Sequence, residues 1–251
     1  MVRHIGEDSD LKLYKFIPFK YVKRIVENGN MPIKRIDGWE DCYENYFLKN
    51  RFVVGIEQYD LKKISRRFYG PCFSTLPESD ALWRIYSDVS GLITGRADAL
   101  DNVAIRVRVS PRQLYLMVPV RSDVSGVSNV QRVEYKTKDE IENAINDGNP
   151  YTLDTLTNSI RDSFYTKRQE FSHEKEARYV FVTDNYHKSK TIEMSLNPLA
   201  FFEEFTVDPR LNRNQYVAVR RELEALRIPA ARINQSELYH FDQKKLRIVT
   251  P

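Results

Sequence analysis

The sequence predicts an α+β fold, with a single domain over residues 1–251 and a split, mostly antiparallel sheet with flanking helices. β-strand patterns dominate residues 91–136, and helical patterns lie on both sides of them. The strands and helices do not alternate regularly, as they would in a doubly wound parallel sheet. The sequence contains no internal repeat, low-complexity tract or Gly/Ser linker, which favours one domain.

Alternation of apolar and polar residues predicts the strands. The first covers residues 12–17 and ends at Pro18. A strand over 103–109 places Val and Ile on one face and Arg106 and Arg108 on the other. The remaining predicted strands are 52–57, 69–75, 114–120, 130–135, 178–183, 191–196, 204–207 and 246–249.

Capping residues and helical spacing predict the helices. Residues 21–27 repeat apolar side chains at helical spacing, with Gly29 at the expected C-cap. Ser79 caps a helix whose apolar face carries Leu82, Trp83 and Tyr86. Residues 39–50 form either a short helix or an ordered loop. The other predicted helical segments are 60–67, 137–146 with a capping box and an end at 148–150, 152–171, and 208–227 with an N-cap at Asp208.

Composition excludes several classes of protein. The 39 Lys+Arg and 35 Asp+Glu give a net charge of +4, which is mild for a protein that wraps nucleic acid. With 41% hydrophobic residues the chain can bury a substantial core, so we expect a soluble globular protein. Cys42 and Cys72 are too few for a disulfide framework, which predicts a reducing cytoplasm.

Several sequence signatures are missing. The chain has no GxxxxGK[ST], GxGxxG, HExxH, GxSxG or CxxC motif. We expect no metal site, because the four histidines are widely separated. We expect no secretory signal and no membrane partner, because residues 1–10 lack a basic head followed by an apolar stretch and no apolar run approaches ~18 residues.

An acidic pair in the late part of the chain is the most informative motif. If a strand begins at Glu174, its period of two places Glu174, Glu176 and Arg178 on one face. Two carboxylates in one site could bind ribose hydroxyls and stabilise a cationic sugar. The alternative is an exposed ladder of charges in which Arg178 pairs with a glutamate across one pleat.

A second candidate combines a hydroxyl with aromatic rings. Ser74 at a strand end, followed by Trp83 and Tyr86 on a helix, could form a pocket wall for a planar ring, with Ser74 as a hydrogen-bond donor. The alternative is structural: Trp83 and Tyr86 pack in the core and Ser74 caps a turn.

Five short segments in this order resemble a known family. They are LYKF at 13–16, WEDCYE at 39–44, CFS at 72–74, WRIY at 83–86 and EKEAR at 174–178. Together they look like the bacterial AbiGi-type domain of unknown function (domain of unknown function two-nine-seven-one), over nearly the whole chain. The resemblance implies a bacterial protein of abortive-infection, antiphage or toxin-like context, with an antitoxin or defence protein as a partner.

The chain is also similar to the ADP-ribosyltransferase fold, which has a basic residue on the first strand, a serine-containing strand and a late ExE. This similarity implies an NAD-binding effector that acts on a nucleic-acid or protein acceptor. It implies that Glu176 stabilises charge as nicotinamide leaves and that Glu174 positions the acceptor. The residues expected to hold the nucleotide are Tyr14, Lys15, Ser74, Trp83, Tyr86 and Arg178.

The arginines support a rival hypothesis. A non-catalytic binding module, such as a defence sensor, could use an arginine-rich face to hold nucleic acid or a phage component, because guanidinium groups suit phosphates. The same arginines could equally form a solvated face. A nuclease is a third, less favoured hypothesis, since the sequence shows no metal site. The arginines concerned are Arg66, Arg67, Arg106, Arg108, Arg112, Arg121, Arg210, Arg213, Arg220 and Arg221.

Overall fold

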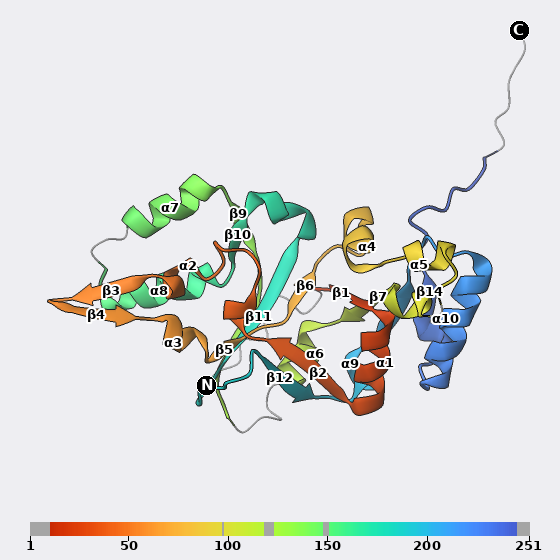
Figure 1. Cartoon of the computed structure of the whole chain (residues 1–251), viewed down its shortest axis with the longest axis horizontal. Helices are drawn as coiled ribbons and strands as arrows, with labels where there is room; N and C mark the ends of the chain where they lie inside the picture. Colours follow the sequence, from red (N-terminus) through yellow and green to blue (C-terminus); the bar gives the residue numbers. More distant parts are fainter. Residues whose placement is uncertain (1–10, 97, 118–122, 148–150, 245–251) are drawn as a thin grey trace, which may run out of the picture.

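An eight-stranded sheet forms the centre of the protein (Figure 1). The computed structural model describes residues 11–96, 98–117, 123–147 and 151–244. The strand order is β14-β13-β7-β1-β6-β11, and β5 and β8 also pair with β11. The pairing is antiparallel except between β13 and β14, which confirms the predicted α+β class. The strands are β1 (Leu13–Pro18), β5 (Phe68–Tyr69), β6 (Cys72–Ser74), β7 (Ala104–Val109), β8 (Val124–Arg132), β11 (Glu176–Thr183), β13 (Glu204–Val207) and β14 (Ile233–Gln235).

The sheet splits between β1 and β6. Along one edge, β1 pairs with β7 through all six of its residues. Along the other edge, it pairs with β6 only where Tyr14 faces Ser74. From that point β6 follows β11, with three consecutive residue pairs. The predicted split of the sheet is therefore confirmed, and the edge of β1 beyond Tyr14 faces an opening.

Smaller elements surround the sheet, and the β3–β4 hairpin extends from one end of the molecule (Figure 1). Three two-stranded sheets join β2 (Asn30–Lys34) with β12 (Thr191–Ser195), β3 (Arg51–Val54) with β4 (Glu57–Asp60), and β9 (Glu134–Lys136) with β10 (Thr166–Arg168). The helices are α1 (Phe19–Asn28), α2 (Tyr46–Lys49), α3 (Lys62–Ser65), α4 (Asp80–Tyr86), α5 (Ser90–Ile93), α6 (Pro111–Met117), α7 (Lys138–Asp147), α8 (Leu153–Ser163), α9 (Pro198–Phe201) and α10 (Arg213–Ala225). Short 3₁₀ helices include η1 (Ile36–Gly38), η2 (Ala99–Asn102), η4 (Gln169–Glu174) and η5 (Ala230–Arg232).

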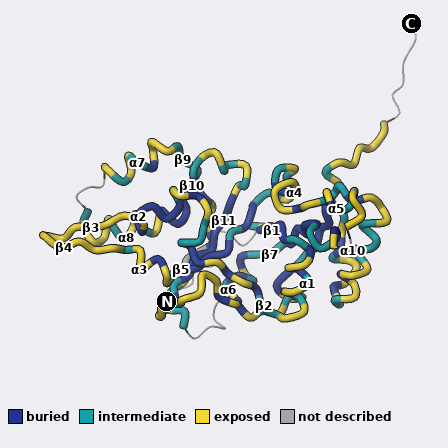
Figure 2. The backbone as a smooth tube through the Cα atoms, in the orientation of Figure 1, coloured by how far each residue is buried: buried dark blue, intermediate teal, exposed yellow. Residues whose placement is uncertain are grey.

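The largest hydrophobic core lies along the sheet, where the tube in Figure 2 is mostly buried. Leu13, Val107 and Phe205 from three adjacent strands are completely buried there. Helix α1 contributes Val22 and Ile25, which its three-residue spacing places on one face. Burial of such aliphatic and aromatic side chains contributes roughly 1.5–3 kcal/mol each, so this core fixes the position of β1.

Two predicted elements differ from the structure. Residues 114–117 belong to helix α6 and not to a strand, because Pro111 starts a helix whose Leu114 and Met117 both reach the core. Residues 118–120 lie outside the described residues. Helix α10 begins at Arg213 and not near Asp208, because Asn212 and Gln215 form a reciprocal capping box there.

Other segments are divided differently from the prediction. Residues 152–171 hold α8, strand β10 and the start of η4. The predicted strand 52–57 is a hairpin that turns at Gly55, where φ is +63°. Strand β11 begins at Glu176 and not at Glu174, because Lys175 has a φ of +44° and breaks the extended backbone. Residues 148–150 and 246–249 lie outside the described residues.

A glycine substitution tests the end of α1. Gly29 has a φ of +65°, and its N–H donates to the Ile25 carbonyl at 2.9 Å. We expect Gly29→Ala to lower the free energy of unfolding by about 1–2 kcal/mol, because an L side chain disfavours this backbone conformation. Gly38→Ala is the control, since a Cβ there would meet open space. Equal urea midpoints for the two variants would contradict this explanation.

Candidate active site in the split of the sheet

A cleft occupies the opening between β1 and β6. Its first lobe has a volume of about 450 Å³ and is lined by β1, α1, β6 and α4. Its second lobe, of about 650 Å³, extends toward residues 38–44 and η4. The two lobes share eight lining residues, so they form one continuous cleft: Lys15, Met31, Pro32, Lys34, Cys72, Tyr86, Glu174 and Glu176.

Most of the site residues that the sequence predicts lie around this cleft. Five elements (β1, β6, α4, η4 and β11) supply them, and segments more than 150 residues apart in the chain meet there, as Lys15 and Glu174 do. Each of the following lines the first lobe: Tyr14, Lys15, Ser74, Tyr86, Glu174 and Glu176.

The Arg178 guanidinium lies behind the cleft and holds carboxylates there. Arg178 is completely buried and donates to Glu176 Oε2 at 2.6 Å, to the Phe164 carbonyl at 2.8 Å and to Glu44. The Trp39 ring covers the guanidinium at 4.1 Å. Arg178 does not line either lobe, so it holds the carboxylates from behind and does not face a ligand.

Glu176 lines both lobes, and its carboxylate is ionised at neutral pH. Burial would raise the pKa of Glu176, but Arg178 and Lys167 outweigh it and hold that pKa below its ordinary value. Both cations contact the same oxygen, Oε2, at 2.6 Å and 3.5 Å. Arg178 donates twice to this oxygen, from Nη2 at 2.6 Å and from Nε at 3.1 Å.

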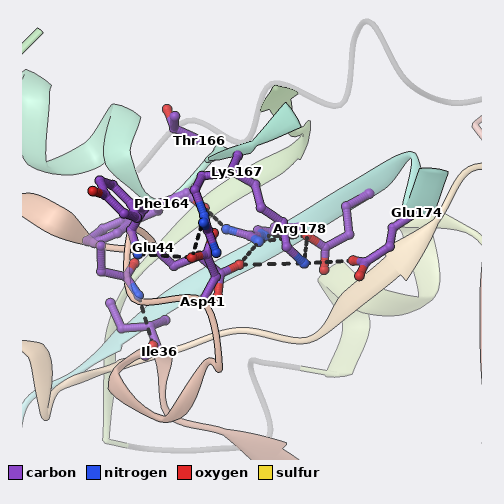
Figure 3. Close-up of polar contacts among 12 residues, drawn as sticks. Ile36, Asp41, Glu44, Phe164, Thr166, Lys167, Glu174 and Arg178 are labelled. Carbon is purple, nitrogen blue, oxygen red and sulfur yellow. Dashed lines mark hydrogen bonds and ion pairs between the residues drawn. The ribbon is translucent and has the colours of Figure 1, made fainter. Parts of the chain in front are cut away.

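Five charged side chains form an ionic cluster beside the cleft (Figure 3). The cations are Lys167 and Arg178, and the carboxylates are Glu44, Glu174 and Glu176. Two cations against three carboxylates leave a formal charge of −1. The five side chains of the cluster therefore carry one negative charge in excess, and the cations Lys15 and Lys34 line the same two lobes.

Sequence reasoning missed two members of this ionic cluster. Glu44 belongs to the WEDCYE segment at 39–44, which carries part of the family resemblance and could have indicated it. Lys167 belongs to β10, in a segment with a predicted helix, and it has no local signal. Burial raises the pKa of Glu44, so Glu176 keeps its charge to lower pH than Glu44 does.

Tyr86 and Lys15 place polar groups at the junction of the two lobes. Burial, with Glu174 and Glu176, raises the pKa of Tyr86 to about 12, so its hydroxyl stays protonated. The Lys15 ammonium donates to the Cys72 carbonyl at 2.8 Å, across the split. Burial lowers the pKa of Lys15, and Lys34 lines both lobes beside it.

Ser74 and Trp83 have structural contacts. The Ser74 hydroxyl donates to the Glu174 carbonyl at 2.7 Å, so Ser74 positions the turn before β11 and its one donor is used. Trp83 is completely buried, packs edge-on against Phe16 at 4.7 Å and donates to Glu78 at 3.0 Å. Trp83 lines neither lobe, so the structure places it in the core and not against a ligand.

Of the ten arginines of the rival hypothesis, four have acidic partners in the described part of the chain. Arg106 does not face solvent as the sequence predicts; it is 6% exposed and paired with Glu78 and Glu204 at 2.6 Å and 2.7 Å. Arg121 lies outside the described residues. The other paired arginines are Arg108 with Glu203 and Glu204, Arg210 with Asp208, and Arg220 with Glu224. These guanidinium groups already have anionic partners, which weakens the case for a phosphate-binding face.

Within residues 11–96, 98–117, 123–147 and 151–244, no group of three or more His, Cys, Asp or Glu side chains is placed to hold a metal ion. Among the helices in these ranges, none combines the length and apolar character that crossing a membrane requires.

Comparisons with known proteins give structural similarity only. No protein-family model matches the chain, and no curated protein matches it. Solved structures of DarT from Thermus sp. 2.9 are similar to it. The complex with NAD+ has 13% identity, covers 94% of this chain and 100% of DarT, and has a TM-score of 0.40. The complex with ADP-ribosylated ssDNA has 13% identity, coverage of 96% and 100%, and a TM-score of 0.38.

Removing the buried guanidinium tests the ionic cluster. We expect Arg178→Met to lower the free energy of unfolding by about 3–5 kcal/mol, because Glu44 and Glu176 would lose their shared partner. Urea denaturation at pH 7 measures this loss.

The control is Arg24→Met, which removes an exposed pair with Glu193 at 3.5 Å. We expect it to change stability by less than about 1 kcal/mol. If both variants had the same unfolding free energy, Arg178 would not anchor the cluster.

Proposed function

We propose that the cleft binds NAD or a related nucleotide, and that the protein cleaves the bond between nicotinamide and ribose and transfers ADP-ribose to an acceptor. The chain would then act as an ADP-ribosyltransferase-like, toxin-like effector. One observation carries the proposal: an ionised Glu176 lies at the junction of two lobes, in an ionic cluster with one carboxylate in excess.

The chemistry of this bond requires such a carboxylate. As the C–N bond breaks, its electron pair leaves with nicotinamide, and positive charge develops on the ribose. A fixed carboxylate in a water-poor cleft stabilises this oxocarbenium-like transition state. Lys167 and Arg178 hold Glu176 through Oε2. They restrict the movement of the carboxylate, so little reorganisation is needed when charge develops.

The two lobes suit two substrates. The first lobe is lined mainly by apolar and aromatic side chains, such as Phe16 and Tyr86, which fit a planar ring. The side chains of Lys15 and Lys34 supply positive charge for phosphates. The second lobe lies on the other side of Glu174 and Glu176 and leaves room for an acceptor, whose nucleophile Glu174 would position.

The acceptor and the biological context remain predictions. Nucleic acid and protein are both candidate acceptors, and single-stranded DNA is the first to assay, since one DarT complex contains ADP-ribosylated ssDNA. The antiphage role and an antitoxin or defence partner follow from the family resemblance alone, and the cytoplasmic location follows from the low cysteine count. Phage challenge of cells with and without the protein tests that role.

Loss of the Glu176 charge tests the reaction. We expect Glu176→Gln to reduce nicotinamide release from NAD by about 100-fold or more, because the transition state loses its fixed negative charge. Chromatography of released nicotinamide measures this loss, and thermal unfolding confirms that the variant is folded.

Glu204→Gln is the matched control. Glu204 also has a pKa held below its ordinary value, with the Thr206 hydroxyl and Arg106 opposing burial, but it does not line the cleft. We expect this variant to keep wild-type activity. A folded wild-type protein that neither binds NAD nor releases nicotinamide would remove the proposal.

A further inference from the structure

Lys167 lies where it can act on both cleft carboxylates. It is 8% exposed, and its ammonium is 2.7 Å from Glu174 Oε2 and 3.5 Å from Glu176 Oε2. It is also 3.8 Å from Glu44 Oε1. The ring of Phe171, a residue of η4, lies 4.7 Å from the Lys167 ammonium. Lys167 therefore contacts all three acidic members of the ionic cluster, as Figure 3 shows for Glu44 and Glu174.

The β9–β10 ribbon fixes Lys167 at this point. Lys167 on β10 pairs with Tyr135 on β9, and the Tyr135 hydroxyl accepts a hydrogen bond of 2.7 Å from the Glu176 N–H. The same ribbon thus contacts Glu176 through its backbone and through its carboxylate. This attachment leaves Lys167 little freedom to move away from the cleft.

Glu174 and Glu176 both line the two lobes, and a cation between two carboxylates in one site attracts both of them. Arg178 pairs with Glu44 and Glu176. Among the described cations, Lys167 is the one within ion-pairing distance of Glu174. Among the residues that the structure describes, only Lys167 therefore bridges the two carboxylates that line both lobes.

We infer that Lys167 is a positioning residue that bridges Glu174 and Glu176 and holds their two carboxyl groups side by side in the cleft. The link to catalysis rests on the proposed function, whereas the bridge itself does not. The titratable groups around the ammonium are Glu44, Glu174, Glu176, Arg178, Tyr86 and Tyr135.

Lys167 keeps its positive charge over the pH range of the proposed assays. Burial would lower the pKa of Lys167, but Glu176, Glu174 and Glu44 raise it above its ordinary value. Lys167 in turn helps to keep the pKa of Glu176 low. Removal of the ammonium should therefore raise the pKa of this carboxylate, and activity that needs it ionised should decline at a higher pH.

Three variants test the bridge. Lys167→Met removes the charge, Lys167→Arg keeps it, and Lys136→Met is the control on β9, where Lys136 pairs with Glu134 at 3.0 Å outside the cleft. Carbon-13 NMR of labelled glutamates follows carboxylate titration without reference to activity. The pH profile of nicotinamide release is the second readout.

We expect Lys167→Met to raise the pKa of Glu176, and with it the acidic limb of the pH profile, by about 1 unit or more. Lys167→Arg and Lys136→Met should keep both near wild type. Unchanged carboxylate titration in Lys167→Met would overturn the inference. A shifted titration without nicotinamide release from any protein, wild type included, would leave the bridge intact and refute the proposed function.

A second variant covers the case in which Lys167→Met does not fold. In Glu174→Gln the ammonium loses its closest carboxylate, at 2.7 Å. NMR of the labelled lysine ammonium should then show a lower pKa for Lys167 than in the wild type. An unchanged pKa would overturn the inference.

Discussion

The need to compensate one buried guanidinium organises the site. Arg178 is completely buried, and removing its partners would leave an uncompensated charge in the interior. Those partners come from distant parts of the chain: Glu44 before α2, the Phe164 carbonyl after α8, and Glu176 on β11. Their meeting point lies beside the cleft. The interaction that stabilises this part of the fold therefore also places carboxylates where a ligand would bind.

The split of the sheet gives that cluster access to a ligand. Since β6 pairs with β11 and leaves β1 after one residue pair, the first strand and the late acidic strand diverge. The Lys15 ammonium crosses the gap to the Cys72 carbonyl. A continuous sheet would have covered Glu176, whereas the divergence leaves it in contact with both lobes.

Local patterns predicted the elements whose ends depend on nearby residues. The αL cap at Gly29, the Ser79 cap of α4 and the reciprocal contacts of Thr137 and Glu140 all occur as expected. The prediction failed at residues 114–117, where apolar composition favoured a strand and the Pro111 helix start decides the structure. Helix caps depend on a few neighbouring residues and can be predicted from the sequence. Where two patterns compete, as at residues 114–117, the sequence does not show which one decides the structure.

The site was predicted in part for the same reason. The order of the motifs predicted that Lys15, Ser74 and Glu176 meet in one site, and all three line the first lobe. Glu174 also lines it, but from η4 and not from a strand. Nothing near Lys167 in the sequence indicates a role, because its importance arises only when β10 pairs with β9 beside Glu176. Trp83 shows the opposite error, since it belongs to α4, which lines the cleft, but its own ring is buried in the core.

The most direct test compares two ligands that differ in the charge of one ring. Calorimetric titration with NAD+ and with NADH, at neutral pH and equal salt, measures whether the cleft prefers a cationic nicotinamide. The excess carboxylate predicts tighter binding of NAD+. Equal affinities, or tighter binding of NADH, would contradict the claim that this cleft is built to stabilise positive charge.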